Sequence, residues 1–149
     1  MLRDDLELTL DQLISLCNDA WEDYEEAAAA TEDAEMSALF TELAMQRREM
    51  AEVLKRQVRR MGERPRDRDT NLGAAERLLT RIRAAFARDP RLALLEECER
   101  ADGRIAAKMA HALNTVDLRA EDRDILTRYH GDVTASVGRL AALRTRLFP

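Results

Sequence analysis

The chain has 149 residues, the usual size of one domain, and at this length about two thirds of the surface that the unfolded chain exposes can be buried. With 36% charged residues, 4% aromatic residues and only five Gly and three Pro, the composition is typical of a helical protein and argues against a sheet. The formal charge of -5 argues against nucleic acid as a partner. No run of residues reaches the roughly 20 apolar positions of a membrane span or looks like a signal peptide, so we expect a cytoplasmic protein that does not enter a membrane.

Charge is distributed unevenly along the chain. Residues 1–35 contain twelve acidic residues and one arginine, whereas residues 47–68 contain nine basic and four acidic residues. The simplest interpretation is an acidic helix that lies beside a basic one. The alternative, an anion or nucleic-acid site on residues 47–68, is opposed by the acidic total and by the lack of aromatic residues in that stretch.

The first helix is predicted from Leu6 to about residue 29. Apolar or small residues recur there at steps of three and four, as on one face of an amphipathic helix. They are Leu6, Leu10, Leu13, Cys17, Ala20, Tyr24 and Ala27. Trp21, on the same helix, is interpreted as a packing residue or as part of a subunit contact.

The second helix is predicted to begin after Thr31 or Asp33, either of which can cap it, and to end near Met61. Gly62 suits the left-handed conformation that follows many helices, and Pro65 prevents continuation. Its apolar seam consists of Met36, Leu39, Phe40, Leu43, Met50, Val53, Leu54 and Val58.

Residues 63–71 are polar and rich in turn formers, which predicts a solvated loop. A shorter amphipathic helix is predicted next, capped by Asp69, Thr70 or Asn71. Its apolar face holds Leu72, Ala75, Leu78, Leu79, Ile82 and Phe86.

Asp89 followed by Pro90 predicts the start of the third long helix, because it combines a capping side chain with proline at the first helical position. The apolar seam of this helix is Leu92, Leu95, Cys98, Ile105, Met109 and Leu113. Residues 114–117 interrupt it, and the last helix is predicted over about residues 118–147. The seam of that helix is Leu126, Tyr129, Val133, Leu140, Leu143 and Leu147.

Four long helices of similar length, joined in pairs by short loops, predict an all-α fold. The segment between Gly62 and Pro90 is long enough to return along the bundle, which is the single long crossover of ferritin-like proteins. We therefore predict one domain over residues 1–149, a ferritin-like antiparallel four-helix bundle with a short extra helix in the crossover.

Several polar residues lie in the predicted seams, near the middle of their helices. They are Gln46, Arg47, Glu99, Asp102 and His130. Because mid-helix residues of antiparallel neighbours meet at one level, we expect them to form an interior polar network. Buried charge has to be paired, and Arg47 offers its guanidinium to Glu99 or Asp102. One alternative is that these side chains turn outward to solvent.

A metal site is the rival interpretation of the same region. Its candidate ligands for iron or another divalent metal are Glu49, Glu99, Asp102 and His130. Arg47, however, would bring a positive charge to the position where the cation would have to lie.

A complete di-iron motif is missing. A ferritin-like di-iron centre takes a Glu-x-x-His pair from each of two helices. The chain has only His111 and His130, which are preceded at three residues by Lys108 and Thr127. We therefore predict no catalytic residue and no bound cofactor, with iron or another divalent metal as the alternative. Cys17 and Cys98 lie far apart without a CxxC motif and are interpreted as small buried hydrophobic residues.

The chain resembles a bacterial family of ferritin-like four-helix-bundle domains of unknown function. The resemblance lies in residues 10–28 (LDQLISLCNDAWEDYEEAA), 39–65 (LFTELAMQRREMAEVLKRQVRRMGERP) and 94–113 (LLEECERADGRIAAKMAHAL), and within them in Gln46-Arg47, in Gly62 with Pro65, and in residues 97–100 (ECER). It implies the same fold and no defined activity. Members of the family often have histidine or tryptophan where this chain has Glu76, Leu79 and Val137, which speaks further against a metal site here.

These observations predict a non-catalytic helical bundle that acts through its surface as a binding or scaffold protein and forms a homodimer. One alternative is a divalent-metal-binding protein with a degenerate ferritin-like site. Another is an enzyme that uses the polar layer on a small molecule, which requires a pocket beside Gly131.

Overall fold

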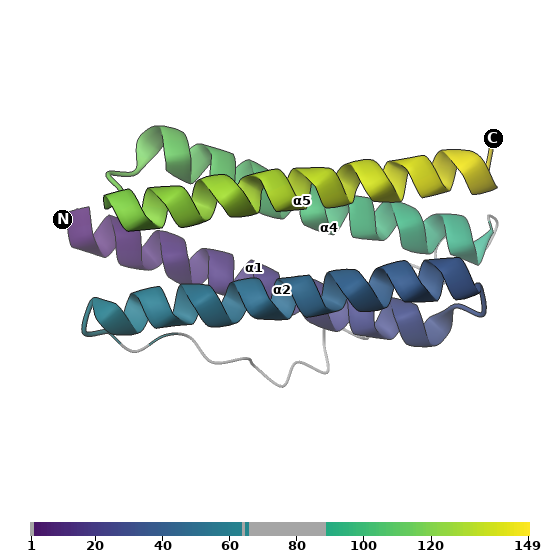
Figure 1. Cartoon of the computed structure of the whole chain (residues 1–149), viewed down its shortest axis with the longest axis horizontal. Helices are drawn as coiled ribbons and strands as arrows, with labels where there is room; N and C mark the ends of the chain where they lie inside the picture. Colours follow the sequence, from purple (N-terminus) through teal and green to yellow (C-terminus); the bar gives the residue numbers. More distant parts are fainter. Residues whose placement is uncertain (1, 64, 66–88) are drawn as a thin grey trace.

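The computed structural model describes residues 2–63, 65 and 89–149 of the chain. These residues form four helices and no strand, which confirms the all-α prediction for this part of the chain. The helices are α1 (Leu2–Ala30), α2 (Ala34–Arg60), α4 (Pro90–Thr115) and α5 (Ala120–Leu147). They lie side by side along a common long axis (Figure 1). The predicted short helix with its caps, and most of the predicted loop, fall outside the described residues.

The ends of α2 follow the predicted capping chemistry. Asp33 is its N-cap, and the carboxylate of Asp33 accepts a hydrogen bond of 3.0 Å from the backbone amide of Met36. Thr31 lies outside the helix and accepts a 3.2 Å bond from the amide of Asp33 instead. Gly62 follows the helix with φ of 80°, a conformation that a residue with a Cβ adopts only with strain. The turn that ends α2 therefore depends on glycine.

The start of α4 is also as predicted. Asp89 is the N-cap, its carboxylate accepts a 2.9 Å bond from the amide of Arg91, and Pro90 occupies the first helical position. Four residues separate the end of this helix from α5, which begins at Ala120 after Arg119, whose side chain makes no capping bond.

The helices pair as two hairpins. α1 packs along α2, and α4 packs along α5, while α1 also packs on α4 and the approach between α2 and α5 is the least close. One hydrophobic core joins all four helices, with side chains such as Leu10, Phe40, Leu95 and Leu126 fully buried. Four residues of the predicted seams are only partly buried: Val53, Leu113 and Leu147, which pack against the edge of this core, and Leu92.

Contacts at the two ends of the bundle fix which helix ends meet. Arg60 at the end of α2 pairs with Glu121 at the start of α5. At the opposite end, Glu35 at the start of α2 pairs with Arg146 at the end of α5. Nη1 of Arg91, at the start of α4, lies 3.9 Å from Oδ2 of Asp33, the N-cap of α2. Figure 1 shows the starts of these two helices at the same end of the bundle. Among the described helices, none combines the length and the apolar character that a membrane crossing needs.

Candidate functional site

A buried ion pair lies in the middle of the bundle. Arg47 of α2 and Asp102 of α4 are both 0% exposed. Nε and Nη2 of Arg47 donate to Oδ1 and Oδ2 of Asp102, each over 2.9 Å. This is the two-pronged geometry in which a guanidinium and a carboxylate bind most strongly.

The other two helices each add a hydroxyl to this pair. Tyr24 of α1 donates its phenolic hydrogen to Oδ2 of Asp102 over 2.5 Å. Nη2 of Arg47 donates to Oγ of Ser136 on α5 over 2.8 Å, and Ser136 donates in turn to the carbonyl of Asp132. Tyr24, Arg47, Asp102 and Ser136, here called the central polar cluster, therefore connect all four helices at one level.

The surroundings of the cluster act on the protonation of Arg47 and Tyr24. Burial works to lower the pKa of Arg47, but the hydrogen bonds and the negative charge of Asp102 outweigh it and leave that pKa raised. Burial, followed by the negative charge of Asp102, holds the pKa of Tyr24 well above its ordinary value. Arg47 therefore stays protonated, and Tyr24 stays a hydrogen-bond donor to Asp102 near neutral pH.

Both cysteines lie in the core beside the cluster and are free thiols. Burial raises the pKa of Cys17 to about 12, with the charge of Arg47 opposing and that of Asp102 adding to the shift. Burial likewise raises the pKa of Cys98 well above its ordinary value. Since the thiolate is the nucleophile and the metal ligand, neither side chain is prepared for that chemistry.

Of the predicted interior residues, Arg47 and Asp102 are brought together and the others lie apart from them. Glu99 does not bind Arg47, because it accepts two bonds from Arg144 of α5 instead, the shorter being 2.7 Å. Gln46 is half-buried, and its Oε1 has no hydrogen-bond partner among the described residues. It faces a different side of α2 from Arg47, as successive helical residues do.

His130 and Glu49 also lie outside the cluster. His130 is half-buried and precedes Ser136 by six residues, which is about 9 Å along α5. Glu49 is exposed on α2. Two residues of the cluster, Tyr24 and Ser136, were not among the predicted network residues. A buried tyrosine requires a partner for its hydroxyl, and this was the signal available at Tyr24.

The residues present do not fit a di-iron centre. Both oxygens of Asp102 bind donors of Arg47 and Tyr24, and a guanidinium occupies the space between the helices where a cation would need ligands. In the described part of the chain, no group of three or more His, Cys, Asp and Glu side chains could hold a metal ion.

The basic stretch of the sequence is partly internal. Arg47 and Lys55 are buried, and Arg60 is paired with Glu121. The guanidinium of Arg48 stacks 5.1 Å from the ring centre of Trp21, so α1 and α2 are joined there by a cation–π contact. The described basic residues thus contribute largely to contacts within the chain.

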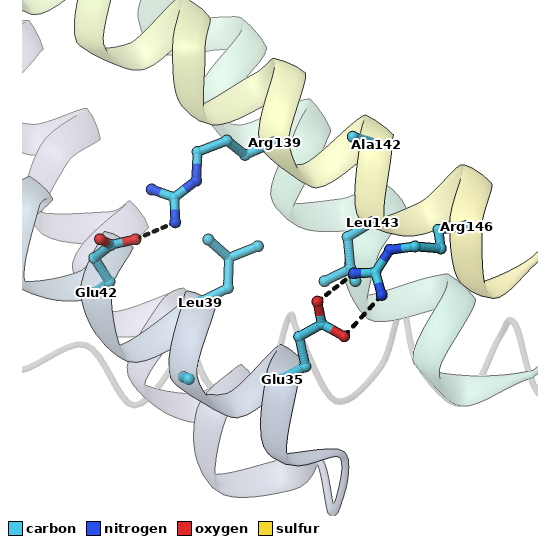
Figure 2. A pocket seen from close by; sticks show the side chains of 8 residues that line it. Glu35, Leu39, Glu42, Arg139, Ala142, Leu143 and Arg146 are labelled. Carbon is cyan, nitrogen blue, oxygen red and sulfur yellow. Dashed lines mark hydrogen bonds and ion pairs between the residues drawn. The ribbon is translucent and has the colours of Figure 1, made fainter.

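A surface groove of about 540 Å³ runs between α2 and α5, where the two hairpins approach least closely. Leu39 and Leu143 line its floor (Figure 2). Arg139 pairs with Glu42 across the groove over 2.5 Å, and Arg146 pairs with Glu35 one heptad away. Gly131, where a catalytic pocket would have been needed, does not line it.

The chain is similar to a family of domains whose role is undefined. Among curated proteins, no match was found. The family model of a domain of unknown function, DUF2383, matches residues 5–115, which include most of α1, all of α2 and α4, and three of the four residues of the central polar cluster. The chain therefore belongs to the DUF2383 family, a domain of unknown function.

Proposed function

We propose that this protein is a non-catalytic, single-domain bundle of ferritin-like antiparallel topology that serves as a binding or scaffold protein and assembles as a homodimer. The central polar cluster supports the proposal that the protein is not an enzyme. The α2/α5 groove on the surface supports the proposal that it assembles as a homodimer.

The end contacts of the helices support the ferritin-like topology. Arg60 with Glu121 and Glu35 with Arg146 are the contacts expected if α2 and α5 run in opposite directions. Arg91 beside Asp33 brings the start of α4 to the start of α2, so these two helices run the same way. A parallel second and third long helix is what a single long crossover produces.

One observation carries the non-catalytic proposal: the buried guanidinium of Arg47 in the middle of the bundle. It binds Asp102 with two bonds and Ser136 with a third, and Tyr24 binds Asp102 from α1. A metal ion entering there would have to displace a permanently charged group that is fully buried. The guanidinium of Arg47, still buried, would then have lost the carboxylate of Asp102 as its partner, and a buried unpaired charge costs several kcal/mol.

The same cluster suits a scaffold. Polar side chains from four helices bind one another at one level of the bundle. Any rotation or axial shift of one helix would therefore leave a buried donor or acceptor without a partner. We propose that the cluster fixes the relative positions of the four outer helix faces, which are the surfaces that a partner would contact.

Elemental analysis of the native protein, purified without chelators, tests the interior proposal. We expect far less than one metal ion per chain, and no change of metal content in Glu99→Ala. A content near one or two ions per chain that disappears in both Asp102→Asn and Glu99→Ala would contradict the proposal and favour the divalent-metal alternative.

Light scattering tests the assembly proposal separately, because it does not depend on metal content. We expect a particle of twice the 17.0 kDa chain mass. A mass equal to one chain at all accessible concentrations would contradict the homodimer and leave the conclusion about the interior unchanged.

A further inference from the structure

The α2/α5 groove has two edges of opposite charge. On α2 the edge is formed by the carboxylates of Glu35 and Glu42, which are one heptad apart. On α5 it is formed by the guanidinium groups of Arg139 and Arg146, again one heptad apart. The four side chains pair across the groove but stay 50–58% exposed, so each can accept a second partner of opposite charge.

Between these charged side chains the groove is lined by apolar residues. Leu39 and Leu143 form the floor, and Ala38 and Ala142 line the groove on either side. Met45 follows Ala38 by seven residues on α2, and Ala135 precedes Ala142 by seven residues on α5, so each lies on the same helix face as that alanine. Both Met45 and Ala135 are exposed. Met45 is 68% exposed. In the described part of the chain, it and Leu8, at 57%, are the two exposed large hydrophobic side chains.

The charge pattern is complementary to itself under one two-fold rotation. If a second copy is turned about an axis parallel to the helices, its α5 lies over α2 of the first copy and its α2 lies over α5. This rotation leaves the position of every residue along the axis unchanged. Glu35 then meets Arg146 of the partner subunit, and Glu42 meets Arg139 of the partner subunit.

The other face-to-face rotation, about an axis that crosses the helices, gives the opposite result. It would lay α2 on α2 and α5 on α5, so that glutamates face glutamates and arginines face arginines. Like charges brought together in this way are strongly unfavourable at an interface. The groove therefore discriminates between the two ways in which two copies could pack.

We propose that the α2/α5 groove is the interface of a homodimer in which α2 of each subunit packs antiparallel on α5 of the other. In this arrangement Met45 lies over Ala135 of the partner subunit, where a small residue leaves room for its side chain. The two ion pairs of each groove become a four-charge network at each edge of the contact. This inference rests on the proposed homodimer and names the surface that forms it.

Light scattering over a dilution series tests the surface with three single variants. Met45→Lys and Ala142→Arg place a charge inside the proposed interface, and Leu8→Lys makes the matched change at the exposed hydrophobic residue on α1. We expect the first two to raise the dimer dissociation constant about tenfold or more, and Leu8→Lys to leave it unchanged, with helical circular dichroism retained in all three.

The outcomes separate the two proposals. A monomeric wild-type chain would overturn both the homodimer and this interface. A dimeric wild-type chain that is insensitive to Met45→Lys and Ala142→Arg, or equally sensitive to Leu8→Lys, would overturn the interface and leave the homodimer standing.

Cross-linking then tests the direction of packing. Met45→Cys and Ala135→Cys are made in separate chains, while Cys17 and Cys98 remain because they are buried. Under mild oxidation we expect a disulfide-linked dimer from the mixture and none from either variant alone, since a disulfide needs Cα atoms within about 7 Å. Cross-linking of the Met45→Cys chain with itself, or no product in the mixture, would overturn the proposed packing.

Discussion

The central polar cluster and the α2/α5 groove contain the same chemical pair in different surroundings. In the cluster, Arg47 and Asp102 are both 0% exposed, whereas Arg139 and Glu42 in the groove are each 50% exposed. Water can replace either partner in the groove, but nothing can replace a partner in the cluster. Burial rather than geometry is therefore expected to decide how strongly an arginine–carboxylate pair affects the stability of this molecule.

The sharpest contrast comes from removing one charge of the buried pair. Asp102→Ala leaves the guanidinium of Arg47 buried and unpaired, and we expect it to lower the free energy of unfolding by about 3–5 kcal/mol. Urea unfolding followed by circular dichroism measures this. Glu99→Ala is the matched control on the same helix, because its partner Arg144 can turn to solvent, and a comparable loss in both variants would contradict the comparison.

Removing one hydroxyl from the cluster is expected to have a smaller effect. Tyr24→Phe keeps the ring and deletes the 2.5 Å bond to Asp102, a bond to a charged group. We expect a loss of about 1.5–3 kcal/mol in unfolding free energy. Tyr129→Phe is the control on α5, and equal losses in the two variants would show that the bond to Asp102 has no special part in stability.

High pH should weaken the fold through the buried thiols. The pKa of Cys17 is raised from 9.0 to about 12 in the folded chain, so above pH 9 the unfolded state releases a proton that the folded state retains. The unfolded state then binds fewer protons, and stability falls by at most about 1.4 kcal/mol per pH unit for this group. Cys17→Ala should flatten the pH dependence of the urea midpoint between pH 9 and 12; an unchanged slope would contradict this expectation.

The smallest effect is expected at the groove. Glu42→Gln should change the unfolding free energy by less than about 1 kcal/mol, and the change should shrink in high salt because the pair with Arg139 is exposed. Thermal unfolding at low and high ionic strength checks this. A loss that matches Asp102→Ala would mean that exposure does not distinguish the two regions.

The sequence predicts the helices well where local chemistry decides. Asp33, Gly62 and the pair Asp89 and Pro90 define helix ends through bonds and dihedral preferences that span only a few residues. The seams locate Arg47 and Asp102 in the interior for a similar reason, because a helical period places them among apolar neighbours.

Partner choice within the interior could not be predicted in the same way. Glu99 and Asp102 are three residues apart and both fit the seam, so only the rotation of α4 about its axis decides that Asp102 faces Arg47 and Glu99 faces Arg144. Ser136 gives no signal in the sequence, since a small polar residue fits an apolar stripe without a visible break. These outcomes depend on the packing of whole helices, which a periodic pattern does not specify.

A double-mutant cycle on Arg47→Met and Asp102→Leu tests the central claim most directly, with unfolding free energies measured for both single variants and the double variant. If the two side chains stabilise each other across α2 and α4, the double variant loses less than the sum of the two single losses, by about 2 kcal/mol or more. Additive losses would contradict the account, since they would mean that the charges of Arg47 and Asp102 do not depend on each other.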